Sequence, residues 1–263
     1  MINSIKKYIS ENRFLKVSLI LFGIVSLVVI SRLAIQEKKN AGVRGFKVSI
    51  AYKDKTKKLI NGEYVKNEVR RHFGYSVTRI KIEDLDIAEI ERVLDNNSFV
   101  DEVEVFIDGR NVLHALLKQK NPIVRISDRN GGYYMDEMGE MIPLSPIAAV
   151  RVPVITGNLV AFDANYKKDE AHQFNEIFKL ATKINEDEFL ELLTEQIHVE
   201  KDGSFLIVPK LGQEKILLGS VEELDNKVYK LKQFYKEGLT REGWGKYALL
   251  DLQDDEIVRA VRN

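Results

Sequence analysis

The chain has 263 residues, enough for one large domain or for two smaller domains with additional segments. Its 40 basic and 40 acidic residues balance, and no basic stripe interleaved with aromatic residues is present, so the composition argues against nucleic-acid binding. The sequence has no cysteine, which excludes disulfides, thiolate zinc sites and cysteine nucleophiles.

The first predicted element is the apolar segment "FLKVSLILFGIVSLVVISRLAI", Phe14–Ile35. As a helix it would be about 33 Å long, which is enough to cross a hydrocarbon core of about 30 Å. A buried core helix should have a polar face, and a cleaved signal peptide should end in a small-residue cleavage site; the segment offers neither. We therefore expect a tail over residues 1–13 and a retained transmembrane helix over 14–35.

Basic residues flank the apolar segment on both sides, so the positive-inside rule gives nearly a tie. Four precede or begin the segment and four end or follow it: Lys6, Lys7, Arg13 and Lys16, then Arg32, Lys38, Lys39 and Arg44. A short N-terminal tail before a long C-terminal portion is typical of an uncleaved signal anchor. This favours a cytoplasmic tail and an extracytoplasmic C-terminal portion.

Two folded parts are predicted after a polar, glycine-containing linker over residues 36–45. Residues 46–120 have the pattern β-α-α-β-β, with helices at 61–74 and 86–97 and a final hairpin around the "DGRN" turn. Residues 121–263 are mostly strands with two longer helices, which predicts a mixed, mainly antiparallel β domain with covering helices. The expected fold class is α+β.

The stretch "GGYYMDEMGEMIPLS" brings Asp136, Glu137 and Glu140 close together in sequence. A catalytic pair needs carboxylates from separate elements, with pKa values set apart by burial. Here the carboxylates lie between two predicted strands, which favours an exposed hairpin turn. In that turn Gly139 would take the left-handed position and Asp136 would accept hydrogen bonds from following amides.

No other pattern in the sequence predicts catalysis. The four histidines lack the spacing of metal ligands: His72, His114, His172 and His198. "GWG" (residues 243–245) lacks the strand and helix that a phosphate-binding loop requires, and "DDE" (residues 254–256) is explained by a turn. We expect no catalytic residue, no metal ligand, no cofactor and no small-molecule substrate.

The order of these parts resembles the bacterial cell-division family FtsQ/DivIB over essentially the whole chain. The anchor precedes a module that looks like the family's POTRA domain. "YYMDEMGEMIPLS", "VPVITG" and the ending "YALLDLQDDEIVRAV" are similar to the family's "Y-x-D-x-x-G-x-x-x-P-x-S", "L-P-x-I-x-G" and "Y-x-x-I-D-L-R" motifs. Gln253 replaces the arginine of the last motif, and Asp254 stands where some members carry an aromatic residue.

The resemblance implies a non-enzymatic scaffold of the divisome in the cytoplasmic membrane at the division septum. Its partners would be FtsB-like and FtsL-like bitopic coiled-coil proteins and the septal peptidoglycan synthesis machinery. A membrane-anchored extracytoplasmic sensor or regulatory binding domain is the alternative. A cell-wall hydrolase would need buried carboxylates from separate elements, which the sequence does not show.

The last predicted strand is the candidate partner-binding site, because only a two-residue tail follows it to cover its outer edge. An uncovered strand edge is a template that another chain can complete. The predicted binding residues are Glu256, Ile257, Val258, Arg259, Ala260 and Val261. Trp244 and Tyr247 are secondary candidates as aromatic anchors, and a core role for Tyr247 is an equal alternative.

Overall fold

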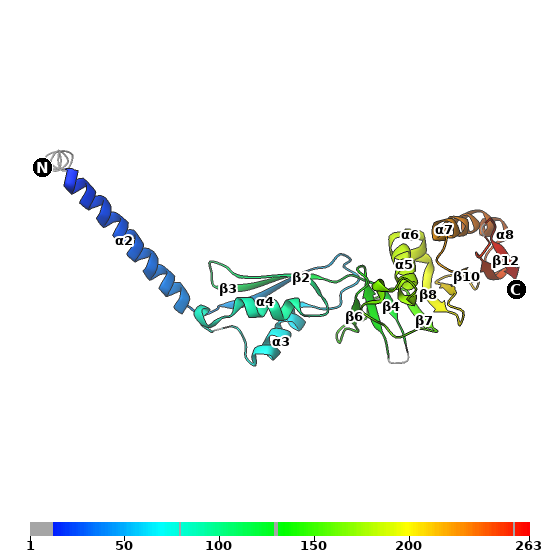
Figure 1. Cartoon of the computed structure of the whole chain (residues 1–263), viewed down its shortest axis with the longest axis horizontal. Helices are drawn as coiled ribbons and strands as arrows, with labels where there is room; N and C mark the ends of the chain where they lie inside the picture. Colours follow the sequence, from blue (N-terminus) through cyan, green and yellow to red (C-terminus); the bar gives the residue numbers. More distant parts are fainter. Residues whose placement is uncertain (1–12, 79, 129–130, 255) are drawn as a thin grey trace. The chain divides into compact units, whose positions relative to one another are not determined.

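The computed structural model describes residues 13–263, except residues 79, 129–130 and 255 (Figure 1). The predicted tail therefore lies outside the described residues apart from Arg13. The chain divides into two compact units. Unit 1 comprises the residues up to 49 with 62–94 and 103–116, and unit 2 comprises residues 50–61, 95–102 and 117–263.

Unit 1 begins with the long helix α2, Arg13–Asn40. The helix continues through the polar residues 36–40, so the predicted linker is wrong over these positions. Glutamine, glutamate and lysine favour helix, and they extend the apolar segment rather than interrupting it. The chain then joins the rest of unit 1 directly, because Ile82 N donates to Ala41 O at 3.0 Å and Val43 N donates to Ile80 O at 2.8 Å.

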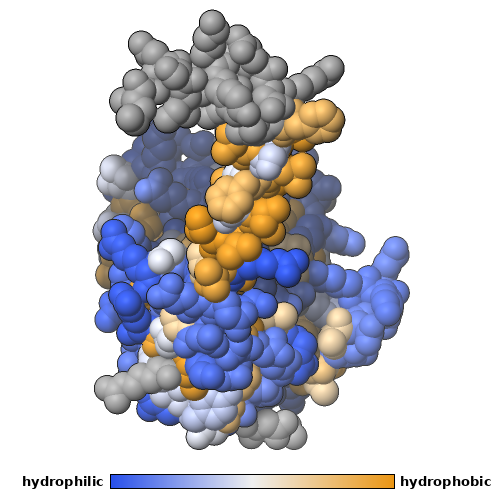
Figure 2. Space-filling model, turned by 90° about the vertical axis from the view of Figure 1, so that its left-hand side faces the viewer, coloured by the Kyte–Doolittle hydropathy of each residue, from blue (hydrophilic) through white to orange (hydrophobic). Residues whose placement is uncertain are grey.

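The apolar side chains of α2 are exposed. Among the described residues, Val17–Asn40 is the one helix long and apolar enough to cross a membrane, with a mean hydropathy of 2.4 and none of its most apolar window buried. Figure 2 shows these side chains as a continuous hydrophobic surface. Such a helix is consistent with a single membrane anchor or a signal sequence.

A three-stranded sheet with two helices follows α2, which confirms the predicted β-α-α-β-β order. Its elements are β1 (Gly45–Ala51), α3 (Gly62–Phe73), the short 3-10 helix η1 (Ile82–Asp84), α4 (Ile87–Asp95), β2 (Val100–Ile107) and β3 (Val112–Gln119). The strand order is β1-β3-β2. The apolar face of each helix is buried, through Val65 and Val69 on α3 and through Ile90 and Leu94 on α4.

The remaining strands of unit 2 form one nine-stranded sheet in the order β12-β11-β10-β9-β8-β7-β4-β5-β6. The strands are β4 (Pro122–Ile126), β5 (Tyr133–Asp136), β6 (Met141–Pro143), β7 (Val154–Gly157), β8 (Thr194–Val199), β9 (Phe205–Pro209), β10 (Lys215–Gly219), β11 (Tyr247–Asp251) and β12 (Arg259–Arg262). Three pairings are parallel (β4–β7, β7–β8 and β10–β11), and the other five are antiparallel. The predicted mixed, mainly antiparallel sheet is confirmed.

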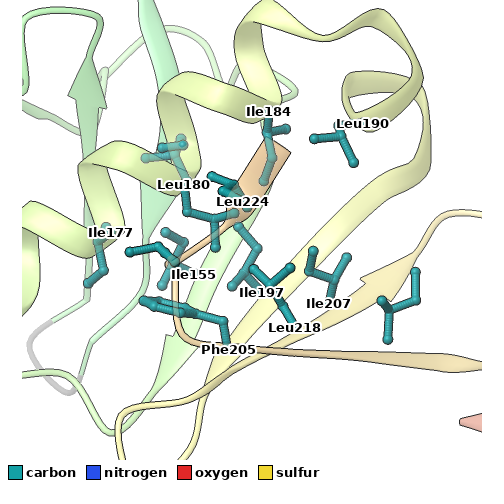
Figure 3. Packing of buried hydrophobic residues seen from close by; sticks show 14 of the residues in the cluster. Ile155, Ile177, Leu180, Ile184, Leu190, Ile197, Phe205, Ile207, Leu218 and Leu224 are labelled. Atoms are coloured by element: carbon teal, nitrogen blue, oxygen red, sulfur yellow. The ribbon is translucent and has the colours of Figure 1, made fainter. Parts of the chain in front are cut away.

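Helices cover this sheet. They are η2 (Tyr166–Lys168), α5 (Gln173–Glu186), α6 (Glu188–Leu193), α7 (Leu224–Gln233), the π-helix η3 (Phe234–Gly238) and α8 (Leu239–Glu242). Figure 3 shows Ile177, Leu180 and Ile184 of α5 pointing toward strand residues such as Ile155 and Ile197. All five are almost completely buried, so the sheet and α5 share the main hydrophobic core of unit 2.

Candidate partner-binding edge and acidic hairpin

Strand β12 forms one outer edge of the nine-stranded sheet. It pairs antiparallel with β11, with Leu250 opposite Ala260 and Leu249 opposite Val261, and in the described residues no further strand pairs with its other side. The strand begins at Arg259, whereas the sequence predicted it from Glu256. Arg259, Ala260 and Val261 therefore lie in the edge strand, and Glu256, Ile257 and Val258 lie in the segment that leads into it.

The two faces of this C-terminal segment differ in burial. Val258 and Ala260 are partly buried and pack against the hydrophobic core of unit 2, whereas Ile257 and Val261 are 54% and 52% exposed. Arg259 is also exposed. Alternate side chains of a strand point to opposite faces, so the inner face holds β12 on the sheet and the outer face presents Val261 and Arg259.

The direction of the main-chain donors follows from the end of β12. Asn263 N donates to Lys246 O at 3.1 Å, so this amide faces the neighbouring strand. Successive amides of a β-strand alternate between its two edges. The amides of Val261 and Arg259 therefore also face β11, and the amide of Ala260 points to the outer edge.

Asp254 fixes the turn before β12. Its Oδ1 atom accepts from Glu256 N at 2.9 Å and from Ile257 N at 3.2 Å, and its Oδ2 atom accepts from Arg259 Nη2 at 2.6 Å. Lys230 Nζ of α7 donates to the main-chain oxygen of Asp254. These amides, followed by Arg259, lower the pKa of the Asp254 carboxyl below its ordinary value. The residue that departs from the family motif thus has a local structural role here.

The two aromatic candidates have different environments. Tyr247 is 8% exposed and makes an edge-to-face contact with Phe234, with 5.5 Å between ring centroids. It belongs to the core, which was one of the two predicted alternatives. Trp244 is 61% exposed, and its ring lies 6.0 Å from that of Tyr235. Trp244 therefore remains available to a partner, whereas Tyr247 supports β11 from inside.

The acidic stretch forms the turn between β5 and β6, as predicted. Asp136 N donates to Glu140 O at 3.0 Å, and Gly139 N donates to Asp136 O at 3.0 Å. Gly139 has φ +75°, the left-handed conformation that favours glycine. Tyr166 OH donates to Gly139 O at 3.1 Å, so a side chain from η2 also holds this turn.

Asp136 is buried, which corrects the prediction of an exposed turn. It is only 2% exposed, and its Oδ1 atom accepts from Met138 N at 2.9 Å and from Glu140 N at 2.8 Å. Burial raises the pKa of the Asp136 carboxyl, and the two amides oppose that rise. Glu137 and Glu140 instead pair with Lys53 and Lys120. The three carboxylates are used in separate local contacts.

The histidines are likewise dispersed among separate local contacts. His72 lies 2.9 Å from Glu89, His114 lies 3.1 Å from Asp108, and His198 lies 3.2 Å from Thr156. His172 caps α5 by accepting from Phe174 N at 3.2 Å. Within the described ranges, no group of three or more histidine, aspartate or glutamate side chains is arranged to hold a metal ion.

Together these features define an α+β protein with one exposed apolar N-terminal helix and a C-terminal nine-stranded sheet in which β12 is an edge strand among the described residues. The family model described as "FtsQ/DivIB, C-terminal related" matches residues 121–259, which is more than half of the chain and nearly all of the nine-stranded sheet. The chain belongs to this FtsQ/DivIB-related family. No curated protein is similar enough in sequence to count as a match.

Proposed function

We propose that this protein is a membrane-anchored, non-enzymatic scaffold of the bacterial division apparatus, which links division proteins during septum formation. Membership of the FtsQ/DivIB-related family supports a role of this kind. The dispersal of the carboxylates and histidines into local contacts supports binding rather than catalysis. The exposed helix α2 supports a single anchor in the cytoplasmic membrane, with the tail inside and the folded parts that follow α2 outside.

The outer edge of β12 is the observation that carries this proposal. Its partners would be FtsB-like and FtsL-like coiled-coil division proteins, with the septal peptidoglycan synthesis machinery beyond them. A partner strand would pair with the outward amide of Ala260, and the exposed side chains of Arg259 and Val261 would select the sequence of that strand. Ile257 and Trp244 would supply apolar contacts beside the strand.

The test is a proline scan of the edge. Ala260→Pro removes the amide that points outward and leaves the amides of Arg259 and Val261 paired with β11, so the sheet should persist. Ala260→Ser is the matched control, because it changes the side chain and keeps the amide. We expect Ala260→Pro to weaken binding of an FtsB-like partner at least about tenfold, as measured by calorimetry with the full chain in detergent micelles.

Both variants must keep the unfolding midpoint of the parent. If one does not, removal of residues 256–263 provides a second measurement, because it deletes the whole edge. The strand-addition hypothesis is wrong if Ala260→Pro and the truncated chain both bind the partner like the parent. In that case the three-stranded sheet is the next surface to test.

The anchor can be tested by two deletions. Removal of residues 1–35 should release the protein from the membrane with its fold intact. Removal of residues 1–43 also deletes the contacts of Ala41 and Val43 with the segment around Ile80, and should reduce the stability of unit 1. A shortened protein that stays with lipid vesicles after a high-salt wash would contradict the single-anchor topology.

A further inference from the structure

Two segments that are distant in sequence meet the chain where α2 ends. Residues 80–82, the loop that leads into η1, are joined to residues 41–43 by main-chain hydrogen bonds of 2.8 and 3.0 Å and by a β-bridge. The tip of the β2–β3 hairpin is joined to the same stretch, because Arg44 N donates to Asn111 O at 2.8 Å. All of these residues belong to unit 1, so the contacts lie within one compact unit.

These contacts place five lysine and arginine residues at the end of α2. Two lie on the last turn of the helix, one follows it, and one comes from each of the two joined segments. We call them the basic collar: Lys38, Lys39, Arg44, Lys81 and Arg110. All five residues are exposed. Local patterns in the sequence do not show this cluster, because the fold brings Lys81 and Arg110 to α2 from distant positions.

The carboxylates in the same region offset only part of this charge. Asp108 of the hairpin tip is turned toward its own turn, where its Oδ1 atom accepts two main-chain amides at 2.9 Å each. Glu83 lies 3.3 Å from Lys81 Nζ. In the part of the chain that the structure describes, the other four cations of the collar make no ion pair, and the exposed Glu37 and Asp84 balance two of them. The collar therefore keeps an excess of positive charge.

The collar lies at the level of the lipid headgroups if α2 crosses the membrane as proposed. The apolar segment ends at Ile35, and Lys38 and Lys39 follow it by about 4.5 and 6 Å along the helix. The headgroup region is about 5–7 Å thick on each side of the hydrocarbon core. Arg44 and the segments joined to it come next, and long basic side chains can extend back toward the headgroups.

Positive charge is unusual on the side of the membrane where the collar would lie. Lysine and arginine are typically in excess in the cytoplasmic segments that flank an anchor. Here Lys38, Lys39 and Arg44 follow the anchor on the opposite side, and the fold adds two more cations to them. A basic cluster beside a transmembrane helix is attracted to anionic lipid, which strengthens binding by about fivefold for each cation near the surface.

We propose that the basic collar binds the anionic phospholipid headgroups of the outer leaflet and so holds the part of unit 1 that follows α2 against the membrane. The proposal rests on the membrane anchor proposed for α2 and is independent of the β12 edge. Arginine suits this role because its guanidinium can donate two parallel hydrogen bonds to a phosphate. The attraction is electrostatic, so it should weaken in about 1 M salt, where the screening length falls to about 3 Å.

A reporter on the hairpin tip tests the proposal. The chain has no cysteine, so Gly109→Cys provides a single labelling site, and a Cβ atom at Gly109 has nothing within 4 Å. The labelled full chain is placed in vesicles whose headgroups carry a spin label that quenches the fluorophore. The vesicles are phosphatidylcholine alone or a mixture with phosphatidylglycerol, which is anionic. We expect at least about twofold stronger quenching with phosphatidylglycerol, and loss of the difference in about 1 M salt.

Charge variants of the labelled chain locate the contact. Lys81→Gln combined with Arg110→Gln should remove most of the increase in quenching. Lys201→Gln combined with Lys215→Gln removes the same charge from exposed positions of unit 2 and should leave the increase unchanged. All four residues are exposed, so both variants should keep the unfolding midpoint of the parent.

Three results would each overturn the proposal: equal quenching in the two kinds of vesicle, an increase that persists in about 1 M salt, or a collar variant that behaves like the parent. The first two comparisons need no charge variant. Retention of the chain by phosphatidylcholine vesicles after a high-salt wash reports on α2 alone. Failure of the anchor is therefore distinguishable from failure of the collar.

Discussion

The two edge strands of the nine-stranded sheet, β6 and β12, differ in length, sequence and exposure. Edge strand β6 is three residues long and ends at Pro143, which has no amide to offer. The segments on either side of β6 are held by side-chain contacts, because Ser145 Oγ donates to Leu59 O at 2.5 Å and Lys167 Nζ contacts Met138 O. Edge strand β12 has no proline and carries an exposed Val261. β6 is therefore the poorer template for a further strand and β12 the better one, and we refer to them as the closed edge and the open edge.

The turns that introduce these edge strands use the same residue type in opposite environments. Asp136 and Asp254 each accept two main-chain amides. Asp136 is buried, and burial raises the pKa of its carboxyl. Asp254 lies nearer the surface, so the amides of Glu256 and Ile257 lower the pKa of its carboxyl with little opposition from burial. Both turns are thus fixed by hydrogen bonds to an aspartate, which is buried at the closed edge and lies near the surface at the open edge.

The largest effect is expected at the closed edge, from Gly139→Val. A Cβ atom at Gly139 would lie 2.2 Å from Tyr166 Oη, and the residue would keep φ +75°. Strain at such a φ costs about 1–3 kcal/mol, and the overlap adds to it, so the free energy of unfolding should fall by more than about 3 kcal/mol. Denaturant unfolding measures this fall.

Gly203→Val is the matched control for that variant. Gly203 has φ +86° in the turn between β8 and β9, with nothing within 4 Å of a new Cβ. The free energy of unfolding of this variant should fall only by the cost of the strained φ, about 1–3 kcal/mol. Equal losses at Gly139 and Gly203 would show that the packing of Tyr166 contributes nothing to the closed edge.

A smaller loss is expected from Asp136→Ala, which leaves two buried amides without an acceptor and should cost about 1–3 kcal/mol. Asp136→Asn keeps an acceptor and removes the charge. Because burial raises the pKa of Asp136 above 3.8, the contribution of its carboxyl to stability is lost as pH rises through the window just above that value, so the parent should lose stability there relative to the asparagine variant. Unfolding curves at several pH values test this, and the same pH dependence in both proteins would contradict it.

The smallest loss is expected from Asp254→Ala at the open edge. Because the pKa of Asp254 is lowered below 3.8, its contribution to stability is present above that value and is lost as pH falls through the folded-state pKa. The difference between parent and variant should therefore be clear near neutral pH and disappear in strong acid. Asp254→Asn should show an intermediate loss, since it keeps an acceptor for the amides and loses the charge that attracts Arg259.

Local patterns predicted the elements of the fold well where one strong signal dominates. Gly139 and the alternation around it predicted the β5–β6 turn, and the spacing of apolar residues predicted α3, α4 and α5. Helix α6 was missed because it is short and follows α5 almost directly. Asp187 is both the C-cap of α5 and the N-cap of α6, so only one residue separates the two helices. The extension of α2 was missed because polarity was interpreted as a linker, although the residues concerned favour helix.

The site was predicted less completely, because burial depends on contacts that are distant in sequence. Nothing next to Asp136 indicates that Tyr166 packs over its turn. Lys57 Nζ likewise lies 3.5 Å from Glu191 Oε1, although the two residues are 134 positions apart in sequence. The location of β12 at the sheet edge was predicted correctly. Its first residue was wrong, because Asp254 holds the preceding segment in a turn.

The direct connection between α2 and the rest of unit 1 has a consequence for how partners meet. A flexible tether would let the folded part move through a wide volume above the membrane, which lowers the effective concentration of each binding surface. Here Asn40 ends the helix and Ala41 and Val43 are already hydrogen-bonded to residues 80–82. If α2 crosses the membrane as proposed, the part of unit 1 that follows α2 is confined to a thin layer near the lipid. A partner anchored in the same membrane then searches nearly in two dimensions, and a modest intrinsic affinity is sufficient for lasting association.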